Sequence, residues 1–289
     1  MDVFLQQLFA GLANGCIYGP MALALVMIHQ ATHNVNFAQG EMATFSTFCA
    51  WALLQAGWSY WAAFACVVAG SFAGGLVLQR VVIRPFERAP ILTKVVVSIG
   101  LLLVFNALTG WIFDHTVRPF PSPFSALPGL GNLLSPHQIG SMLVILVVLG
   151  LLFAFFELTP IGLAMKAAAL NPDSARLVGI SVTWMLALGW GLASAVGAIA
   201  GMLVAPIVFL DPHMMGGIFL YGLAAALLGG IDSPLGAVAG GFLVGILENL
   251  AANYAIGNEL KLTFALVLIV GTLMVRPYGL FGRTVVTRV

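Results

Sequence analysis

The chain has 289 residues, of which 61% are hydrophobic and only 7% are charged. A water-soluble domain of this size carries about a quarter charged residues, so this composition excludes a soluble globular protein. The formal net charge is +1 and the basic residues are scattered, which argues against a nucleic-acid-binding surface.

Long uncharged apolar runs predict transmembrane helices. Backbone groups in hydrocarbon must be satisfied within their own segment, so each apolar run of about 20 residues is expected to be a helix. We predict an all-α, polytopic bundle that forms one transmembrane domain over residues 1–289. About nine spans are expected, with room for a tenth, short or broken one. They lie near residues 5–28, 37–56, 58–79, 95–113, 138–157, 183–207, 216–231 (a short one), 235–255 and 260–276.

The distribution of basic residues predicts the orientation of these spans. Cytoplasmic loops carry an excess of Lys and Arg. One side of the predicted bundle holds only Arg118 and Lys261. We therefore expect the N-terminus outside and the C-terminus in the cytoplasm. The basic residues on the cytoplasmic side are Arg80, Arg84, Arg88, Lys94, Lys166, Arg176, Arg276, Arg283 and Arg288.

Small residues crowd the second half of the chain, where glycine and alanine dominate 191–201 and 229–245. Such stretches let helices approach closely in a membrane. The tetrapeptide Gly11-Leu12-Ala13-Asn14 in the first predicted span is also similar to Gly191-Leu192-Ala193-Ser194 in the sixth, five spans further along the chain. An odd number of spans inverts the second copy, so we predict an inverted repeat.

Two loops stand out. The outer loop 114–137 is rich in proline and is expected to be irregular. The cytoplasmic loop 158–182 predicts two short helices, because Asn171 suits an N-cap, Pro172 the first helical position and Asp173 the positive helix end. Gly179 suits the stop of the second helix. This much helix at a surface indicates docking onto a soluble protein, and a plain surface helix is the alternative.

Polar residues within the predicted spans are candidates for function, because ionisable groups in a membrane are costly. Asn36, Gln39 and Glu41 precede or begin the second span. They either line a pathway, or Asn36 caps the helix with Glu41 in its first turn. Glu248 lies deeper in its span and is open to substrate contact or structural pairing.

No motif for ATP hydrolysis, cofactor binding or metal binding is present. The sequence contains no P-loop, GxSxG or strand-associated GxGxxG pattern, and its three cysteines form no CxxC pair. His29 and His33 are four residues apart without the Glu of an HExxH motif. We therefore expect no cofactor, no metal and no catalytic residues. A membrane-embedded enzyme is an alternative, and its catalytic pair would come from these two histidines, Glu41 and Glu248.

Four segments carry a resemblance to a known family, and they occur in the family's order. The chain resembles permeases of branched-chain amino acid ATP-binding-cassette importers, in particular the first of the two permease subunits, over essentially its whole length. The four segments are Asn36-Phe37-Ala38-Gln39-Gly40-Glu41, Asn171-Pro172-Asp173-Ser174-Ala175 with Gly179-Ile180, Leu228-Gly229-Gly230-Ile231-Asp232-Ser233-Pro234-Leu235-Gly236-Ala237 and Arg276-Pro277-Tyr278-Gly279-Leu280-Phe281-Gly282.

The resemblance implies a multi-pass protein of the bacterial cytoplasmic (inner) membrane that moves branched-chain or similar hydrophobic amino acids by alternating access. It implies a second permease subunit in a heterodimer, two cytoplasmic ATPase subunits and an extracytoplasmic solute-binding protein. The residues that it implies for coupling to the ATPase are Lys166, Asn171, Pro172, Asp173, Ala175 and Gly179. Relatives that carry urea, short amides or aromatic acids leave the substrate open, and a stand-alone channel for small neutral solutes is a further alternative.

Overall fold

The computed structural model describes residues 2–32, 34–87, 89–124 and 134–282. Within them, all regular elements are helices, apart from one isolated antiparallel bridge between Arg118 and Leu210. The all-α prediction is confirmed. The α-helices are α1 (Asp2–Thr32), α2 (Gln39–Gln55), α3 (Tyr60–Leu78), α4 (Ile91–Phe113), α5 (Pro136–Leu158), α6 (Pro160–Leu170), α7 (Pro172–Leu177), α8 (Val182–Val208), α9 (Met215–Gly229), α10 (Pro234–Ala251) and α11 (Lys261–Val275).

Each predicted span coincides with a helix to within a few residues. Seven helical stretches in the described part of the chain are long and apolar enough to cross a membrane, which establishes a multi-pass helical bundle. The spans predicted at 37–56 and 216–231 correspond to the shorter helices α2 and α9, of 17 and 15 residues.

The predicted loop after the third span differs in detail from the structure. Arg80 and Arg84 lie on a helical continuation of α3, formed by the π-helical turn η1 (Gln79–Ile83) and the 3-10 turn η2 (Arg84–Phe86), rather than in a loop. Shorter turns also flank the last two spans, as η3 (Ala252–Ile256) and η4 (Asn258–Leu260). The proline-rich loop is irregular over 114–124. Pro128, Arg88, Arg283, Arg288 and His33 lie outside the described residues.

The chain folds into two compact units, each of which combines segments from both halves of the sequence. The first comprises Met1–Val26, Phe124–Met142 and Gly217–Val289, and therefore joins most of α1 to α9, α10 and α11. The second comprises Met27–Pro123 and Leu143–Gly216, and joins α2, α3 and α4 to α8. The helices with the similar tetrapeptides are α1 and α8. Helix α1 lies in the unit that contains α9, α10 and α11, and α8 lies in the unit that contains α2, α3 and α4. Such an exchange of one helix between the two halves of the chain is consistent with two repeats, and their inversion stays a prediction.

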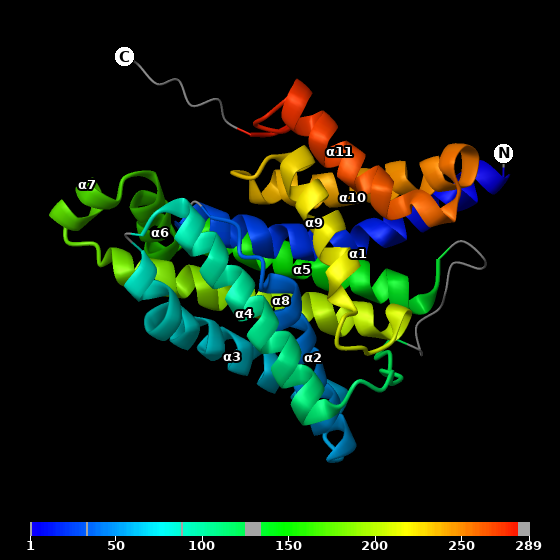
Figure 1. Ribbon diagram of the computed structural model, residues 1–289, viewed down its shortest axis with the longest axis horizontal. Helices are drawn as coiled ribbons and strands as arrows, with labels where there is room; N and C mark the ends of the chain where they lie inside the picture. Colours follow the sequence, from blue (N-terminus) through cyan, green and yellow to red (C-terminus); the bar gives the residue numbers. More distant parts are fainter. Residues whose placement is uncertain (1, 33, 88, 125–133, 283–289) are drawn as a thin grey trace. The chain divides into compact units, whose positions relative to one another are not determined.

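Glycines bring α1 and α10 into backbone contact in the first unit, where the two helices run side by side (Figure 1). Gly241 and Gly245 are four residues apart, so they lie on one face of α10. A Cβ at Gly245 would lie 2.5 Å from both Gly11 O and Gly15 N of α1. Without a hydrophobic driving force between helices in lipid, such close packing supplies the attraction.

Helix α8 forms the core of the second unit, where it packs against α2 and α3. A Cβ at Gly75 of α3 would lie 2.5 Å from both Trp190 O and Ser194 Oγ of α8. On α8, Gly201 faces the backbone of Ala43 in α2. The small residues predicted to permit close packing therefore lie at helix crossings in both units.

Replacement of Gly245 by Ala is expected to destabilise the protein by about 1–3 kcal/mol, because the added methyl group meets backbone atoms that cannot turn aside. Gly271→Ala is the matched control, since Gly271 is also helical and a Cβ there has nothing within 4 Å. Thermal unfolding in detergent measures both variants. Equal stability of the two would contradict the packing described for α1 and α10.

Candidate functional site

The start of α2 lies nearly halfway along α8 in the second unit. Gln39, the first residue of α2, donates a hydrogen bond from Nε2 to Ala193 O at 2.9 Å. Ala193 is 11 residues into α8, which begins at Val182, so it lies about 17 Å from the start of that helix at a rise of about 1.5 Å per residue. Helix α2 therefore begins inside the unit, which explains its length of only 17 residues.

Asn36 shapes the turn that leads into α2. Its side-chain Oδ1 accepts a hydrogen bond from Ala38 N at 3.0 Å, and its carbonyl oxygen accepts one from Gln39 N at 3.2 Å. The N-cap residue of α2 is Ala38, so the alternative in which Asn36 is the cap is wrong in position. Glu41 does lie in the first turn, as that alternative expected. Asn36 and Gln39 are both almost fully buried.

Glu41 belongs to a polar cluster drawn from three segments of the second unit. Asn106 of α4 donates a hydrogen bond from Nδ2 to Glu41 Oε2 at 3.1 Å, and the same nitrogen lies 3.0 Å from His213 Nδ1. The backbone N–H of His213 donates to Asp211 Oδ1 at 2.8 Å. Asn106 and His213 were not among the predicted site residues, whereas Asp211 was a candidate as an ionisable residue at the edge of a span. The polar character of Asn106 within an otherwise apolar span was the one signal that pointed to it.

Glu248 lies in the first unit and has partners of its own. Tyr18 of α1 donates its hydroxyl hydrogen to Glu248 Oε2 at 2.7 Å, and Lys261 Nζ lies 3.9 Å from Oε1. The ring of Tyr18 stacks on Tyr221 of α9, with centroids 4.7 Å apart. A buried carboxylate with a hydroxyl donor and a cation is paired, so this geometry favours the structural alternative for Glu248.

The two helices predicted in the loop 158–182 are confirmed as α6 and α7. Asn171 Oδ1 accepts a hydrogen bond from Ser174 N at 3.0 Å, and Pro172 is the first residue of α7. Asp173 pairs with Arg176 at 2.8 Å on the surface of α7. After α7, Gly179 adopts a φ of +85°, a conformation that residues with a Cβ rarely take.

The remaining residues predicted for coupling have structural partners. Ala175 is buried with Ala168 and Val182, and it fixes α7 against α6 and α8. Lys166 pairs with Glu157 at the end of α5. Apolar side chains that the prediction did not name stand out from this surface: Leu170, Leu177 and Val178 are 83%, 89% and 77% exposed. Exposed apolar side chains next to a charged helix are typical of an interaction surface.

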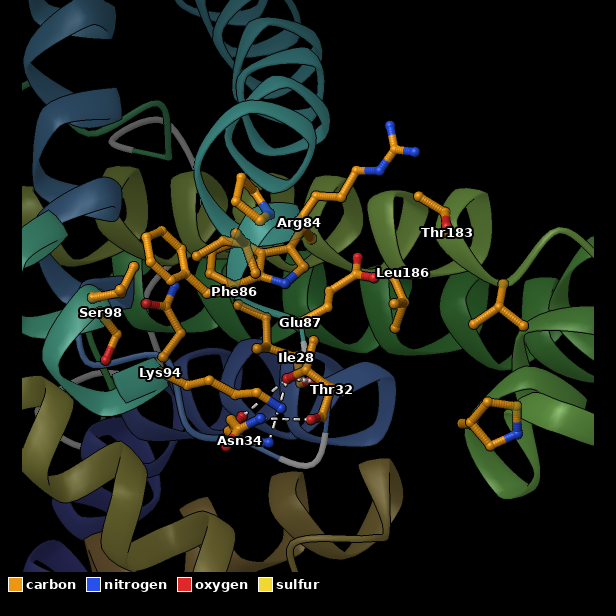
Figure 2. Close-up of a pocket in the computed structure, with 18 of the residues that line it drawn as sticks. Ile28, Thr32, Asn34, Arg84, Phe86, Glu87, Lys94, Ser98, Thr183 and Leu186 are labelled. Atoms are coloured by element: carbon orange, nitrogen blue, oxygen red, sulfur yellow. Dashed lines mark hydrogen bonds between the residues drawn. The ribbon is translucent and has the colours of Figure 1, made fainter. Parts of the chain in front are cut away.

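A cavity of about 630 Å³ opens beside α7 within the second unit (Figure 2). Its wall includes Pro172 and Arg176 of α7, Lys94 and Ser98 of α4 and Trp190 of α8. The end of α1 and the segment before α2 contribute as well. In the described part of the chain, no three residues of the His, Cys, Asp and Glu types gather in a way that would hold a metal ion.

Membrane-length apolar helices that enclose buried polar side chains define this chain as a multi-pass helical membrane protein. The family model described as "Branched-chain amino acid transport system / permease component" matches residues 7–273, and the chain belongs to this family.

Two of the relatives are similar over nearly the whole chain. The high-affinity branched-chain amino acid transport system permease protein LivH of Escherichia coli (strain K12) is 27% identical, with 99% of this chain and 98% of that protein aligned. The corresponding protein BraD of Pseudomonas aeruginosa is 29% identical with the same coverage. Among solved structures, PsaBC from Streptococcus pneumoniae in complex with Fab is similar with a TM-score of 0.49 and 13% identity, over 93% of this chain and 91% of that one.

Replacement of Gly197 by Ala is expected to destabilise the protein by about 1–3 kcal/mol, because the new methyl group displaces Gln39 and leaves its buried amide without a partner. In a Gln39→Ala background the same substitution should cost little, since the next residue near that Cβ is Ala43, whose Cβ lies 3.7 Å away. A double-mutant cycle of unfolding measurements in detergent tests this coupling. Additive effects would show that Gln39 does not occupy the space beside Gly197.

Proposed function

We propose that this protein is a membrane-embedded permease subunit of an ATP-binding-cassette importer and translocates branched-chain or similar hydrophobic amino acids. The observation that carries the proposal is the family match over residues 7–273. The names of the full-length relatives support the substrate class. Importers of this kind place ATP hydrolysis on separate subunits, so the permease itself is expected to have no enzymatic activity.

The proposed topology has nine crossings, with α2 and α9 as short spans, the N-terminus outside and the C-terminus in the bacterial cytoplasm. The distribution of Lys and Arg supports this orientation. It puts α6 and α7 at the cytoplasmic surface and the proline-rich loop 114–137 outside. The membrane is the bacterial cytoplasmic (inner) membrane, where an ATP-driven importer has access to cytoplasmic ATP.

The proposed partners are a second permease subunit, two cytoplasmic ATPases and an extracytoplasmic solute-binding protein. The segment from Lys166 to Gly179 docks onto an ATPase, with the exposed Leu170, Leu177 and Asp173 as contacts. Asn171, Pro172 and Ala175 hold α7 in place against α6 and α8, as their cap and packing contacts indicate. Because α6 and α7 form a rigid pair, a movement of the ATPase displaces α8. Helix α8 is then the two-state element that alternating access requires.

The proposed pathway passes the polar start of α2. Asn36, Gln39 and Glu41 are the polar groups in the middle of the second unit, and a helix that begins inside a bundle is a frequent feature of transporters. Glu248 is assigned a pairing role rather than substrate contact, on the basis of its bonds to Tyr18 and Lys261. Urea, short amides and aromatic acids are the alternative substrates, and a stand-alone channel is the alternative mechanism.

Thiol labelling tests the orientation. With the native Cys16, Cys49 and Cys66 replaced, Ser174→Cys should react with a membrane-impermeant reagent only after cells are permeabilised. Val117→Cys, in the loop proposed to be outside, should react in intact cells, since Val117 is 63% exposed. Labelling of position 174 in intact cells would remove the basis for an ATPase-docking role.

Charge reversal tests the coupling role. Asp173→Lys should lower ATP-dependent leucine uptake by the complete importer at least about tenfold, which corresponds to about 1.4 kcal/mol of lost docking. The protein level should not change, because a solvent-exposed ion pair contributes less than about 1 kcal/mol to stability. Glu259→Lys is the control, an exposed carboxylate at the opposite end of the proposed topology. Leucine flux through the permease alone in liposomes would refute the importer and favour the channel.

A further inference from the structure

We propose that the cavity beside α7 is a binding site for a zwitterionic amino acid with an apolar side chain. The inference rests on the proposed function for the choice of ligand, and it adds to that function a specific site in the second unit. The volume of the cavity is about 630 Å³, which lies in the range of small-molecule sites, about 300–1,000 Å³, and exceeds the volume of one amino acid.

Lys94 supplies a cation for the ligand's carboxylate. Its side chain is half-buried, and within the described part of the chain the ammonium group makes no salt bridge or hydrogen bond. Figure 2 shows Lys94 extending toward the wall formed by Asn34 and Thr32. The side-chain amide of Asn34 bonds to Thr32 O at 2.7 Å, which holds that wall in place. A half-buried ammonium group without an acidic partner is stabilised by an anionic ligand.

Glu87 supplies an anion for the ligand's ammonium group. Gln79 donates a hydrogen bond to Glu87 Oε1 at 2.7 Å, and this bond fixes the carboxylate while it leaves Oε2 for a ligand. Figure 2 shows Glu87 directed toward Leu186, on a different part of the cavity wall from Asn34. Arg84 and Arg176 line the cavity as well, and Arg176 pairs with Asp173. We assign Lys94 and Glu87, at separate places on the wall, to the two charges of an amino acid. They suit a purely anionic lipid headgroup less well, because Glu87 would repel it.

Trp190 adds a hydrogen-bond donor that has no acceptor in the described structure. This residue is 3% exposed and lines the cavity, and its Nε1–H finds no partner among the described residues. A buried indole N–H without a partner costs about 1–3 kcal/mol, so a ligand oxygen is favoured there once a small shift of the neighbouring side chains uncovers this nitrogen. Ile28, Val97 and Leu186 also line the cavity and offer apolar surface for an aliphatic side chain.

The position of the cavity joins this site to the proposed coupling segment. Pro172 and Arg176 of α7 form part of the same wall as Lys94 and Trp190. An amino acid bound here therefore contacts the helix that is proposed to dock on the ATPase. Its binding affinity depends on where α7 lies, and by linkage an occupied site biases the position of α7.

Leucine binding to the purified full-length chain tests the site. The chain is placed in nanodiscs of phosphatidylcholine, and titration calorimetry is expected to show saturable binding of L-leucine at one site. On the unmodified chain, 4-methylpentanoate, which lacks the ammonium group, and 3-methylbutylamine, which lacks the carboxylate, should each bind at least about tenfold more weakly. These two ligands test both charges without any mutation.

Variants then assign the charges to residues. Lys94→Met and Glu87→Gln should each weaken leucine binding at least about tenfold, and Trp190→Phe, which removes the N–H group together with part of the ring, should weaken it several-fold. Arg84→Met is the matched control, because Arg84 also lines the cavity but Figure 2 shows its guanidinium directed away from Lys94 and Asn34. The Arg84→Met variant should bind leucine with an affinity within about twofold of that of the unmodified chain. Thermal unfolding of each variant establishes that it is folded.

Three results would overturn the site. The first is no leucine binding to the folded chain, and the second is binding that Lys94→Met and Glu87→Gln leave unchanged. The third is protection of a Thr183→Cys variant, at a lining position that holds neither charge of the ligand, from thiol reagents by phosphatidylglycerol but not by leucine, which would make the cavity a lipid site. ATP-dependent uptake by the complete importer, measured in parallel, separates the two proposals: uptake without binding to the isolated chain refutes this site and leaves the permease function intact.

Discussion

The hydrogen bond from Gln39 to Ala193 is the interaction on which the interior of the second unit depends. It ties the first residue of α2 to the middle of α8, so the chain between α1 and α2 must run inward before α2 begins. Backbone groups in such a segment need partners, since lipid offers none. Asn36 meets this need through its bonds to Ala38 N and Gln39 N, and its burial follows from that role. The polar segment 36–41 is therefore a structural requirement and, in the proposed function, a part of the pathway.

Close contact between helices is the second constraint, and glycine makes it possible. The first unit brings α1 and α10 together at Gly11, Gly15 and Gly245, and the second brings α3 and α8 together at Gly75. Both crossings join a helix from one half of the chain to helices from the other half. Helices whose backbones touch cannot slide gradually past one another, because any small shift brings backbone atoms into collision. Each unit is thus suited to move as a body, which alternating access requires of its parts.

The segment α6–α7 combines a rigid backbone with exposed side chains that can contact a partner. Its caps and the buried Ala175 give it a defined shape, while Leu170, Leu177 and Asp173 stand in solvent. In the proposed function this segment contacts an ATPase, and the site proposed in the adjoining cavity adds a contact to a ligand. A helix that touches both a motor and a bound amino acid can make each respond to the other, since coupling between two sites is reciprocal.

The sequence alone determined the helices, because twenty uncharged apolar residues in a row leave the backbone no other way to satisfy its hydrogen bonds. It also determined α6 and α7, since Asn171, Pro172 and Gly179 act locally through capping and backbone conformation. Only the tertiary structure decided the depth at which α2 begins, the partners of Glu41 and Glu248, and the cavity between Lys94, Glu87 and Trp190. Those features join residues from helices far apart in the chain, such as Tyr18 and Glu248. The periodicity of side chains within one helix shows which face is buried but not which other helix covers that face.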